Sequence, residues 1–132
     1  MRDTRWQELS SNECRKLLAG RRLGRVAVVD GDGPAVFPVS YAVDRDAVLF
    51  RAGDWPQLPA QVVLQVDDLD ETGASGWSVT VSGEAMAVQP QELDELRRLR
   101  LRGDGGYVRL RKPSIRGHRI ARQADLPSNW HG

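Results

Sequence analysis

Residues 24–51 constrain the fold more than any other part of the chain. They alternate β-branched and aromatic residues with two short segments, Asp30-Gly31-Asp32-Gly33 and Asp44-Arg45-Asp46. Glycine tolerates a positive φ in the first segment, and aspartate hydrogen-bonds its own backbone in both, so both segments predict tight turns. The stretch is therefore predicted to form three short antiparallel strands, a meander of the kind that builds one wall of a β-barrel.

A helix is predicted just before this meander, over residues 10–19. Ser10 is the expected N-cap, and Glu13, three residues later, completes a capping box. Gly20 is expected at the C-cap. The apolar face, at i, i+3, i+4 spacing, holds Cys14, Leu17 and Leu18. We expect this helix to plug one end of the sheet, with Cys14 acting as a small packing residue and not as a reactive thiol.

Further strands and a second helix are predicted after the meander. Alternating apolar and polar side chains predict strands at 62–66, 77–82, 107–110 and 115–120, with a bulge at Gly83. Acidic residues early and arginines late predict a helix over 90–102, and residues 123–132 predict a loop-like tail. The whole order predicts a single domain over 1–132, mainly β with short helices, in which antiparallel strands form a small barrel.

Composition narrows the function classes. The chain carries 19 basic and 18 acidic residues, a net charge of +1, so its overall field steers neither nucleic acid nor a membrane surface. No apolar run approaches the roughly 20 residues needed to cross a bilayer, and residues 1–6 lack the apolar segment of a secretory signal. We therefore expect a cytoplasmic protein. Arginines collect in the C-terminal third, but they form no motif that interleaves aromatic and basic residues, as nucleic-acid binding would favour.

The motifs of common enzyme classes are missing from the sequence. It has one cysteine, and its two histidines both lie near the C-terminus, so no metal site is expected. No P-loop, dinucleotide fingerprint or nucleophile elbow occurs. A cluster of acids at Asp67, Asp68 and Asp70 is predicted to be a solvated turn at a strand end and not a cation site.

Several short motifs gain specificity from their order along the chain. They are Gly24-Arg25-Val26-Ala27, Phe37-Pro38-Val39-Ser40-Tyr41, Phe50-Arg51, Val66-Asp67-Asp68 and Ser75-Gly76-Trp77-Ser78-Val79. This order resembles the pyridoxamine 5'-phosphate oxidase-like flavoproteins over roughly residues 9–120, and their small bacterial branch more than the vitamin B6 enzyme. The resemblance implies a six- to seven-stranded antiparallel split β-barrel of the FMN-binding type.

The resemblance also implies a cofactor, a partner and a site. It implies a homodimer with FMN in a cleft between the subunits, and an oxidoreductase of unknown substrate; a deazaflavin cosubstrate stays open. The backbone of Val39, Ser40 and Tyr41 would line the isoalloxazine ring, and Arg51 would bind the phosphate. The other implied cofactor-binding positions are Ala52, Gln57, Trp77 and Ser78.

Two of these positions depart from the family pattern. Ala52 stands where a threonine is usual, and Gln57 is nearest the place of a lysine. A lost charge-assisted hydrogen bond costs about 1.5–3 kcal/mol, or tenfold or more in affinity. An alternative therefore stays open, a barrel without cofactor that works as a binding or structural dimer. Alternatively, the partner subunit supplies the phosphate contact from Arg109, Arg111 or Arg116.

Overall fold

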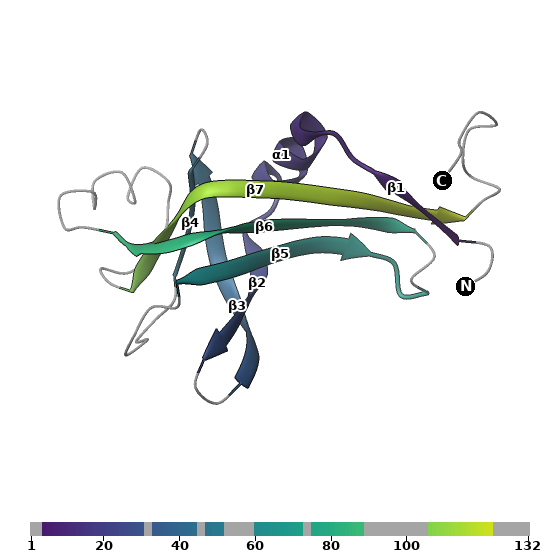
Figure 1. The fold of residues 1–132 in the computed structure, drawn as a ribbon. Helices are drawn as coiled ribbons and strands as arrows, with labels where there is room; N and C mark the ends of the chain where they lie inside the picture. Colours follow the sequence, from purple (N-terminus) through teal and green to yellow (C-terminus); the bar gives the residue numbers. More distant parts are fainter. Residues whose placement is uncertain are drawn as a thin grey trace.

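The structure is a computed structural model that describes residues 4–30, 33–44, 47–51, 60–72, 75–88 and 106–122. Within these residues it contains one helix and seven strands (Figure 1). In chain order they are β1 (Thr4–Glu8), α1 (Ser11–Ala19), β2 (Leu23–Asp30), β3 (Gly33–Asp44), β4 (Ala47–Arg51), β5 (Gln61–Leu69), β6 (Gly76–Ala87) and β7 (Tyr107–Arg122).

All seven strands belong to one antiparallel sheet that closes on itself. The strand order is β1-β7-β4-β3-β2-β5-β6, and β6 pairs in addition with β7. Strands β2 to β7 therefore form a ring, and β1 extends it at one side. Figure 1 shows β5, β6 and β7 running alongside one another while β2 and β3 cross them steeply. The predicted antiparallel split barrel is confirmed.

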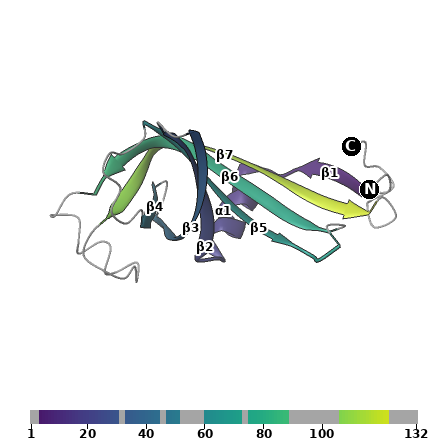
Figure 2. The ribbon, with the colours of Figure 1, turned by 90° about the horizontal axis from the view of Figure 1, so that it is seen from below.

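The split in the barrel lies along one edge of β7. The other edge of β7 pairs with β6 over almost its whole length. On the split edge, residues 107–110 pair with β4, and residues 118–122 pair with β1. Between them α1 packs against β7, and the backbone N–H of Leu9 donates to the carbonyl of Gly117 at 2.9 Å. Helix α1 also contacts β6, and it lies beside that strand in the view from below (Figure 2). The helix therefore fills the opening, as the predicted plug.

The capping box of α1 is confirmed. The backbone N–H of Glu13 donates to the Ser10 hydroxyl at 3.2 Å, and that of Ser10 donates to the Glu13 carboxylate at 3.4 Å. Gly20 is the C-cap, but its φ of −83° is right-handed, so its conformation does not require glycine. Cys14 and Leu18 face the core and are buried.

The inner faces of the strands form the main core. Each strand alternates a buried residue with a more exposed one, as in β5, where Val62, Leu64 and Val66 are buried and Val63 is exposed. The outer face is the side of the sheet that points away from this core. Leu49 and Tyr107 form a separate small buried cluster. The largest members of the main core include Phe50, Leu18, Leu64, Leu110, Val26, Val79 and Val81.

The two predicted hairpins of the meander are confirmed. Strands β2 and β3 pair up to Asp30 and Gly33, and β3 and β4 pair up to Asp44 and Ala47. Gly33 has a φ of 105°, a conformation that favours glycine at this turn.

The predicted bulge at Gly83 is also confirmed. Ser82 pairs with Ser114 and Glu84 pairs with Arg111 across β6 and β7. Two residues of β7 therefore stand opposite this one glycine, which is the count that defines a bulge.

Three predictions about strands were wrong. Strand β1 was not predicted; its Trp6 side chain meets His118 of β7 edge-on, with 5.8 Å between ring centroids. Residues 107–122 form one continuous strand and not two. Strand β5 reaches Leu69, so Asp67 and Asp68 lie in the strand and not in a turn. The predicted helix over 90–102 and the tail over 123–132 lie outside the described residues.

Candidate functional site

The predicted site residues divide between the two faces of the sheet. Val39, Tyr41 and Trp77 point inward and are buried. Ser40 and Ser78 alternate with them and lie on the outer face, where both are partly exposed. The side chains of Ser40 and Ser78 are therefore accessible to ligands, on opposite sides of the closed ring, whereas the three buried side chains support the fold. Ala52 and Gln57 lie outside the described residues.

Along β3, the backbone groups of Ser40 point toward a different neighbouring strand from those of Val39 and Tyr41. The N–H of Tyr41 donates to the carbonyl of Arg22 at 2.9 Å, so Tyr41 directs its backbone groups toward β2. Because these directions alternate along a strand, Val39 also directs its backbone groups toward β2, whereas Ser40 directs its backbone groups toward β4. The β3–β4 pairing begins at Tyr41 and Phe50, and one further step in that register places Ser40 opposite Arg51. Ser40 and Arg51, which is exposed at the end of β4, are therefore neighbours on the outer face.

Tyr41 has a structural role that the sequence did not indicate. Its hydroxyl donates to the carbonyl of Leu18 at 2.6 Å, near the C-terminal end of α1. Burial raises the pKa of this phenol to about 12, although the nearby positive charge of Arg21 opposes the shift. The Tyr41 side chain therefore ties the helix to β3 in its neutral form.

Trp77 is held by the segment that links α1 to β2. The guanidinium carbon of Arg21 lies 5.8 Å from the centroid of the Trp77 ring, within cation–π range. The same guanidinium forms an ion pair with Asp68, which is the strand partner of Trp77. Trp77 thus serves packing within the described residues, and it joins the helix end to β5 and β6.

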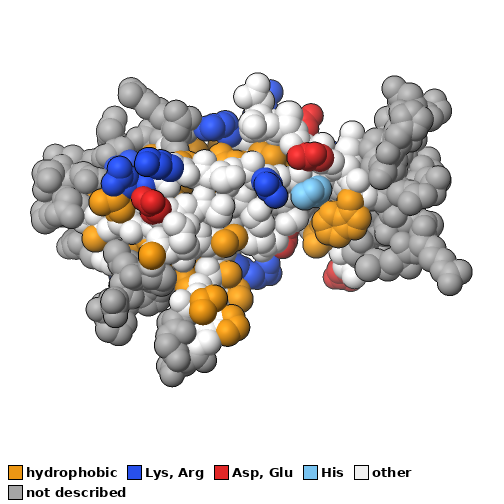
Figure 3. Space-filling model, in the orientation of Figure 1, with side chains coloured by type: hydrophobic (Ala, Val, Ile, Leu, Met, Phe, Trp, Pro, Cys, Tyr) orange, Lys and Arg blue, Asp and Glu red, His pale blue; other side chains and the backbone are white. Residues whose placement is uncertain are grey.

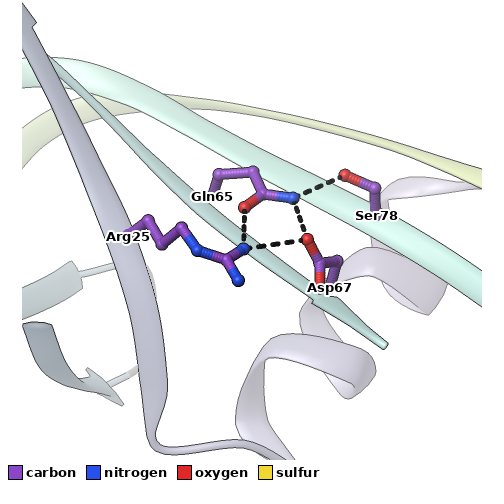
Figure 4. Close-up of polar contacts among 4 residues, drawn as sticks. All are labelled: Arg25, Gln65, Asp67 and Ser78. Atoms are coloured by element: carbon purple, nitrogen blue, oxygen red, sulfur yellow. Dashed lines mark hydrogen bonds and ion pairs between the residues drawn. The ribbon is translucent and has the colours of Figure 1, made fainter. Parts of the chain in front are cut away.

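Four polar side chains from three strands meet on the outer face, and we call them the outer polar network (Figure 4). Arg25 of β2 donates through Nη1 to Gln65 Oε1 and to Asp67 Oδ2, each at 3.2 Å. Gln65 Nε2 donates to Asp67 Oδ2 at 2.6 Å and to Ser78 Oγ at 3.1 Å. The network therefore connects Ser78 of β6 to β2 across β5.

Gly24 allows this network to form. A Cβ atom on Gly24 would lie 2.9 Å from the carbonyl oxygen of Gln65 and 3.0 Å from a methyl group of Val66. Any side chain here would therefore push β2 away from β5 at the crossing of the two strands. The Gly-Arg motif has a physical reason, because the glycine brings β2 close enough for Arg25 to reach Gln65.

Three members of this network were not predicted as site residues. Arg25 and Asp67 lie in the family-like motifs, Asp67 also in the acidic cluster, and Gln65 in an alternating pattern, and none of these patterns predicted that the three would meet. That alternation is the signal that could have grouped them. In β5 the inward residues Leu64 and Val66 are buried, so residues 65 and 67 fall on the polar phase, as residue 78 does in β6.

The three arginines considered for the partner subunit's phosphate contact all lie in β7. Arg109 is partly buried and pairs with Leu49 on one side and Met86 on the other. Arg111 contacts the sulfur of Met86 through Nη1 at 3.1 Å. Arg116 is exposed opposite Thr80. A contact from any of them to a phosphate in a second subunit stays a prediction.

Apolar side chains are exposed on the outer face beside the network. Leu23 is 72% exposed, Val36 is 62% exposed and Val63 is 37% exposed. Val36 and Val63 are both strand partners of Ala27, so they lie in one row across β3, β2 and β5. Figure 3 shows hydrophobic side chains gathered over the region of the β2–β3 hairpin. We call Val36 and Val63 the outer apolar patch.

Two other kinds of site are missing from the described ranges. No group of three or more His, Cys, Asp or Glu side chains there is placed to hold a metal ion. No helix among the same residues has the length and apolar character to cross a membrane.

Comparison with known proteins agrees with this architecture. A crystal structure from Corynebacterium glutamicum, of a protein named after the pyridoxamine 5'-phosphate oxidases, matches with a TM-score of 0.74 and 26% identity over 87% of this chain and 98% of that one. The FAD binding protein from Mycobacterium smegmatis matches with a TM-score of 0.66 and 29% identity over 87% and 98%. An FAD-binding protein from Mesorhizobium loti, at 23% identity, a TM-score of 0.67 and coverage of 86% and 97%, shares the fold.

The sequence comparisons identify the family. No functionally curated protein gave a significant match. The sequence profile described as pyridoxamine 5'-phosphate oxidase matches residues 10–122, which is most of the chain and includes α1 and strands β2 to β7. The resemblance seen in the sequence motifs is therefore confirmed, and the chain belongs to the pyridoxamine 5'-phosphate oxidase family.

Proposed function

We propose that this protein binds a flavin nucleotide, FMN, along the outer face of its sheet and uses it as a cytoplasmic oxidoreductase. The observation that carries the proposal is a pair of complementary polar sets on the outer face: Arg51 with Ser40 on β4 and β3, and the outer polar network on β2, β5 and β6. Because β2 to β7 form a closed ring, β5 and β6 lie across the barrel from β4 and β3, so in a dimer a flavin can meet one set from each subunit. The FAD-binding relative from Mycobacterium smegmatis supports a flavin as the ligand.

The charge of Arg51 suits one end of the ligand. A flavin with its ribityl phosphate is long and carries charge at one end only. The Arg51 guanidinium suits the phosphate, because it can donate two parallel hydrogen bonds to the phosphate oxygens. The ring then extends past Ser40 toward the outer polar network of a second copy of the chain.

A second copy of the chain is part of the proposal. The outer apolar patch leaves Val36 and Val63 exposed to water side by side. Clustered exposed apolar side chains are typical of protein–protein contacts. We propose that a homodimer covers this patch, with the flavin in the cleft between the two subunits and its ring shielded from water.

The bound flavin would supply the electron transfer. The protein's own residues would bind and orient it: Arg51 holds the phosphate and Ser40 contacts the ring, while Ser78 of the second copy approaches it from β6. The substrate would enter on the ring face that the sheet leaves open. A deazaflavin presents a similar ring and is tested beside FMN.

The first test is the visible spectrum of the purified protein. We expect a yellow protein whose released cofactor is FMN, or an apoprotein that quenches the fluorescence of added FMN. Arg51→Ala should weaken FMN binding by tenfold or more, since it removes a charge-assisted contact to the phosphate. Lys16→Ala, which removes the same charge from the exposed side of α1, should leave binding unchanged.

A second candidate function follows from Ala52 and Gln57, which replace the usual phosphate ligands of the family. In that case the barrel is a binding or structural dimer without cofactor. A colourless protein that remains dimeric and does not respond to FMN, FAD or a deazaflavin would favour this function and contradict the first.

A further inference from the structure

Gln65 takes part in three of the four hydrogen bonds of the outer polar network, as a donor in two and as an acceptor in one. Its amide nitrogen donates to Asp67 at 2.6 Å and to Ser78 at 3.1 Å, and its amide oxygen accepts from Arg25 at 3.2 Å. An amide nitrogen has two protons, and both are used here. The Ser78 oxygen is therefore an acceptor toward Gln65, so the Ser78 hydroxyl proton is left to donate in another direction.

Arg25 and Asp67 use only part of their hydrogen-bonding capacity. Arg25 makes its contacts through Nη1, and Asp67 accepts both of its contacts through Oδ2. Arg25 Nη2 is bonded to the same carbon as Nη1, and Asp67 Oδ1 is bonded to the same carbon as Oδ2. A donor and an acceptor therefore lie next to the contact between Arg25 Nη1 and Asp67 Oδ2. Within the described ranges neither of these two atoms takes part in the network, and the Arg25 side chain is 60% exposed.

The pair is not suited to a simple anion. The charge of Asp67 opposes that of Arg25 at 3.2 Å, so a phosphate or carboxylate would meet a carboxylate beside the guanidinium. A group that presents an acceptor and a donor side by side fits better. A cyclic imide has that pattern, with a ring N–H between two carbonyl groups.

We infer that Arg25, Asp67 and Ser78 recognise the imide edge of the flavin ring, and this inference rests on the proposed flavin function. Asp67 lies in β5 between Arg25 of β2 and its own strand partner, Ser78 of β6. The ring N–H donates to Asp67, one carbonyl accepts from Arg25 and the other accepts from Ser78. Gln65 is a positioning residue that holds all three.

A flavin methylated at this ring nitrogen, N3, provides the direct test. In the wild-type protein we expect N3-methyl FMN to bind roughly tenfold or more weakly than FMN, because the hydrogen bond to a charged carboxylate is lost. In Asp67→Ala both flavins should bind equally weakly. Arg25→Ala should weaken both flavins but keep the preference for FMN, since Asp67 remains.

Controls separate this inference from the proposed function. Glu84→Ala, which removes an exposed acid from β6, should keep both the affinity and the preference. Asp67→Asn keeps the shape of the side chain and checks that any loss is not caused by misfolding, which circular dichroism also monitors. If FMN binds but methylation weakens binding equally in the wild-type protein and Asp67→Ala, the inference is overturned and the flavin function stands. If no flavin binds the wild-type protein, both fail.

Discussion

Cys14 of α1 packs directly against Gly117 of β7. A Cβ atom on Gly117 would lie 2.5 Å from the Cys14 sulfur, closer than atoms in contact can approach. The carbonyl of Gly117 also accepts from the N–H of Leu9 at 2.9 Å. Helix α1 can therefore fill the split in the barrel only because residue 117 has no side chain.

Gly117→Ala should destabilise the protein by about 1–3 kcal/mol, the usual cost of overpacking a core. Urea denaturation followed by tryptophan fluorescence measures this change. Cys14→Ala removes the sulfur that the new methyl group would meet. The double variant should therefore recover part of the stability, but not all of it, because the methyl group still lies 3.1 Å from Val79. Strictly additive losses would contradict the contact.

The Cys14 thiol should be unreactive in the folded protein. Burial raises its pKa, and the negative charge of Glu13 adds to this, so the reactive thiolate is disfavoured at neutral pH. We expect Ellman's reagent to label less than about a tenth of the protein in an hour at about pH 8, and one thiol per chain in denaturant. Fast labelling of the native protein would show that α1 leaves the split easily.

Tyr41 should make the protein less stable at high pH. Its folded pKa of about 12 lies above the value of about 10 expected in the unfolded chain, so the unfolded state loses its proton first. Its contribution is fully present below about pH 10 and is lost as the pH rises from about 10 to about 12. Tyr41→Phe should remove this pH dependence and cost about 1 kcal/mol at neutral pH, through the lost bond to Leu18. Denaturation curves between about pH 7 and about pH 11.5 measure both effects.

Charges in the outer apolar patch should dissociate the proposed homodimer. Val36→Lys with Val63→Lys places two like charges in one row of the sheet, where a second copy would have to bury them. We expect light scattering to give the dimer mass for the wild-type protein and the monomer mass, 14.7 kDa, for the variant. Glu71→Lys, in the turn after β5, is the matched control and should stay dimeric. A monomeric wild-type protein would refute the dimer.

Local signals in the sequence predicted α1 and the meander of β2, β3 and β4 correctly. The capping box, the turn residues and the period-two pattern all act over a few neighbouring residues. Strand β1 escaped prediction because its sequence, Thr-Arg-Trp-Gln-Glu, has no apolar alternation, and its partner lies more than a hundred residues later in β7. Strand β7 looked like two strands because Lys112 and Pro113 interrupt its alternation at the bulge.

The candidate site was predictable only in part. The family resemblance pointed to Ser40, Arg51 and Ser78, and the structure places all three on the outer face. The alternation over 77–82 already placed Trp77 in phase with the buried Val79 and Val81, but nothing in the sequence indicated that Arg25 meets Asp67. That contact depends on where β2 crosses β5, which is a property of the closed sheet and not of either strand alone.

The central place of β7 has a consequence for synthesis on the ribosome. This strand comes last among the described elements, yet it holds β6, β4, α1 and β1 together. The emerging chain can form the β2–β4 meander early, but the ring cannot close until the part of β7 that pairs with β4 and β6 has left the exit tunnel. Until the ring closes, the apolar inner faces of the strands in the nascent protein remain exposed to water. A chaperone that binds apolar strands would act in that interval.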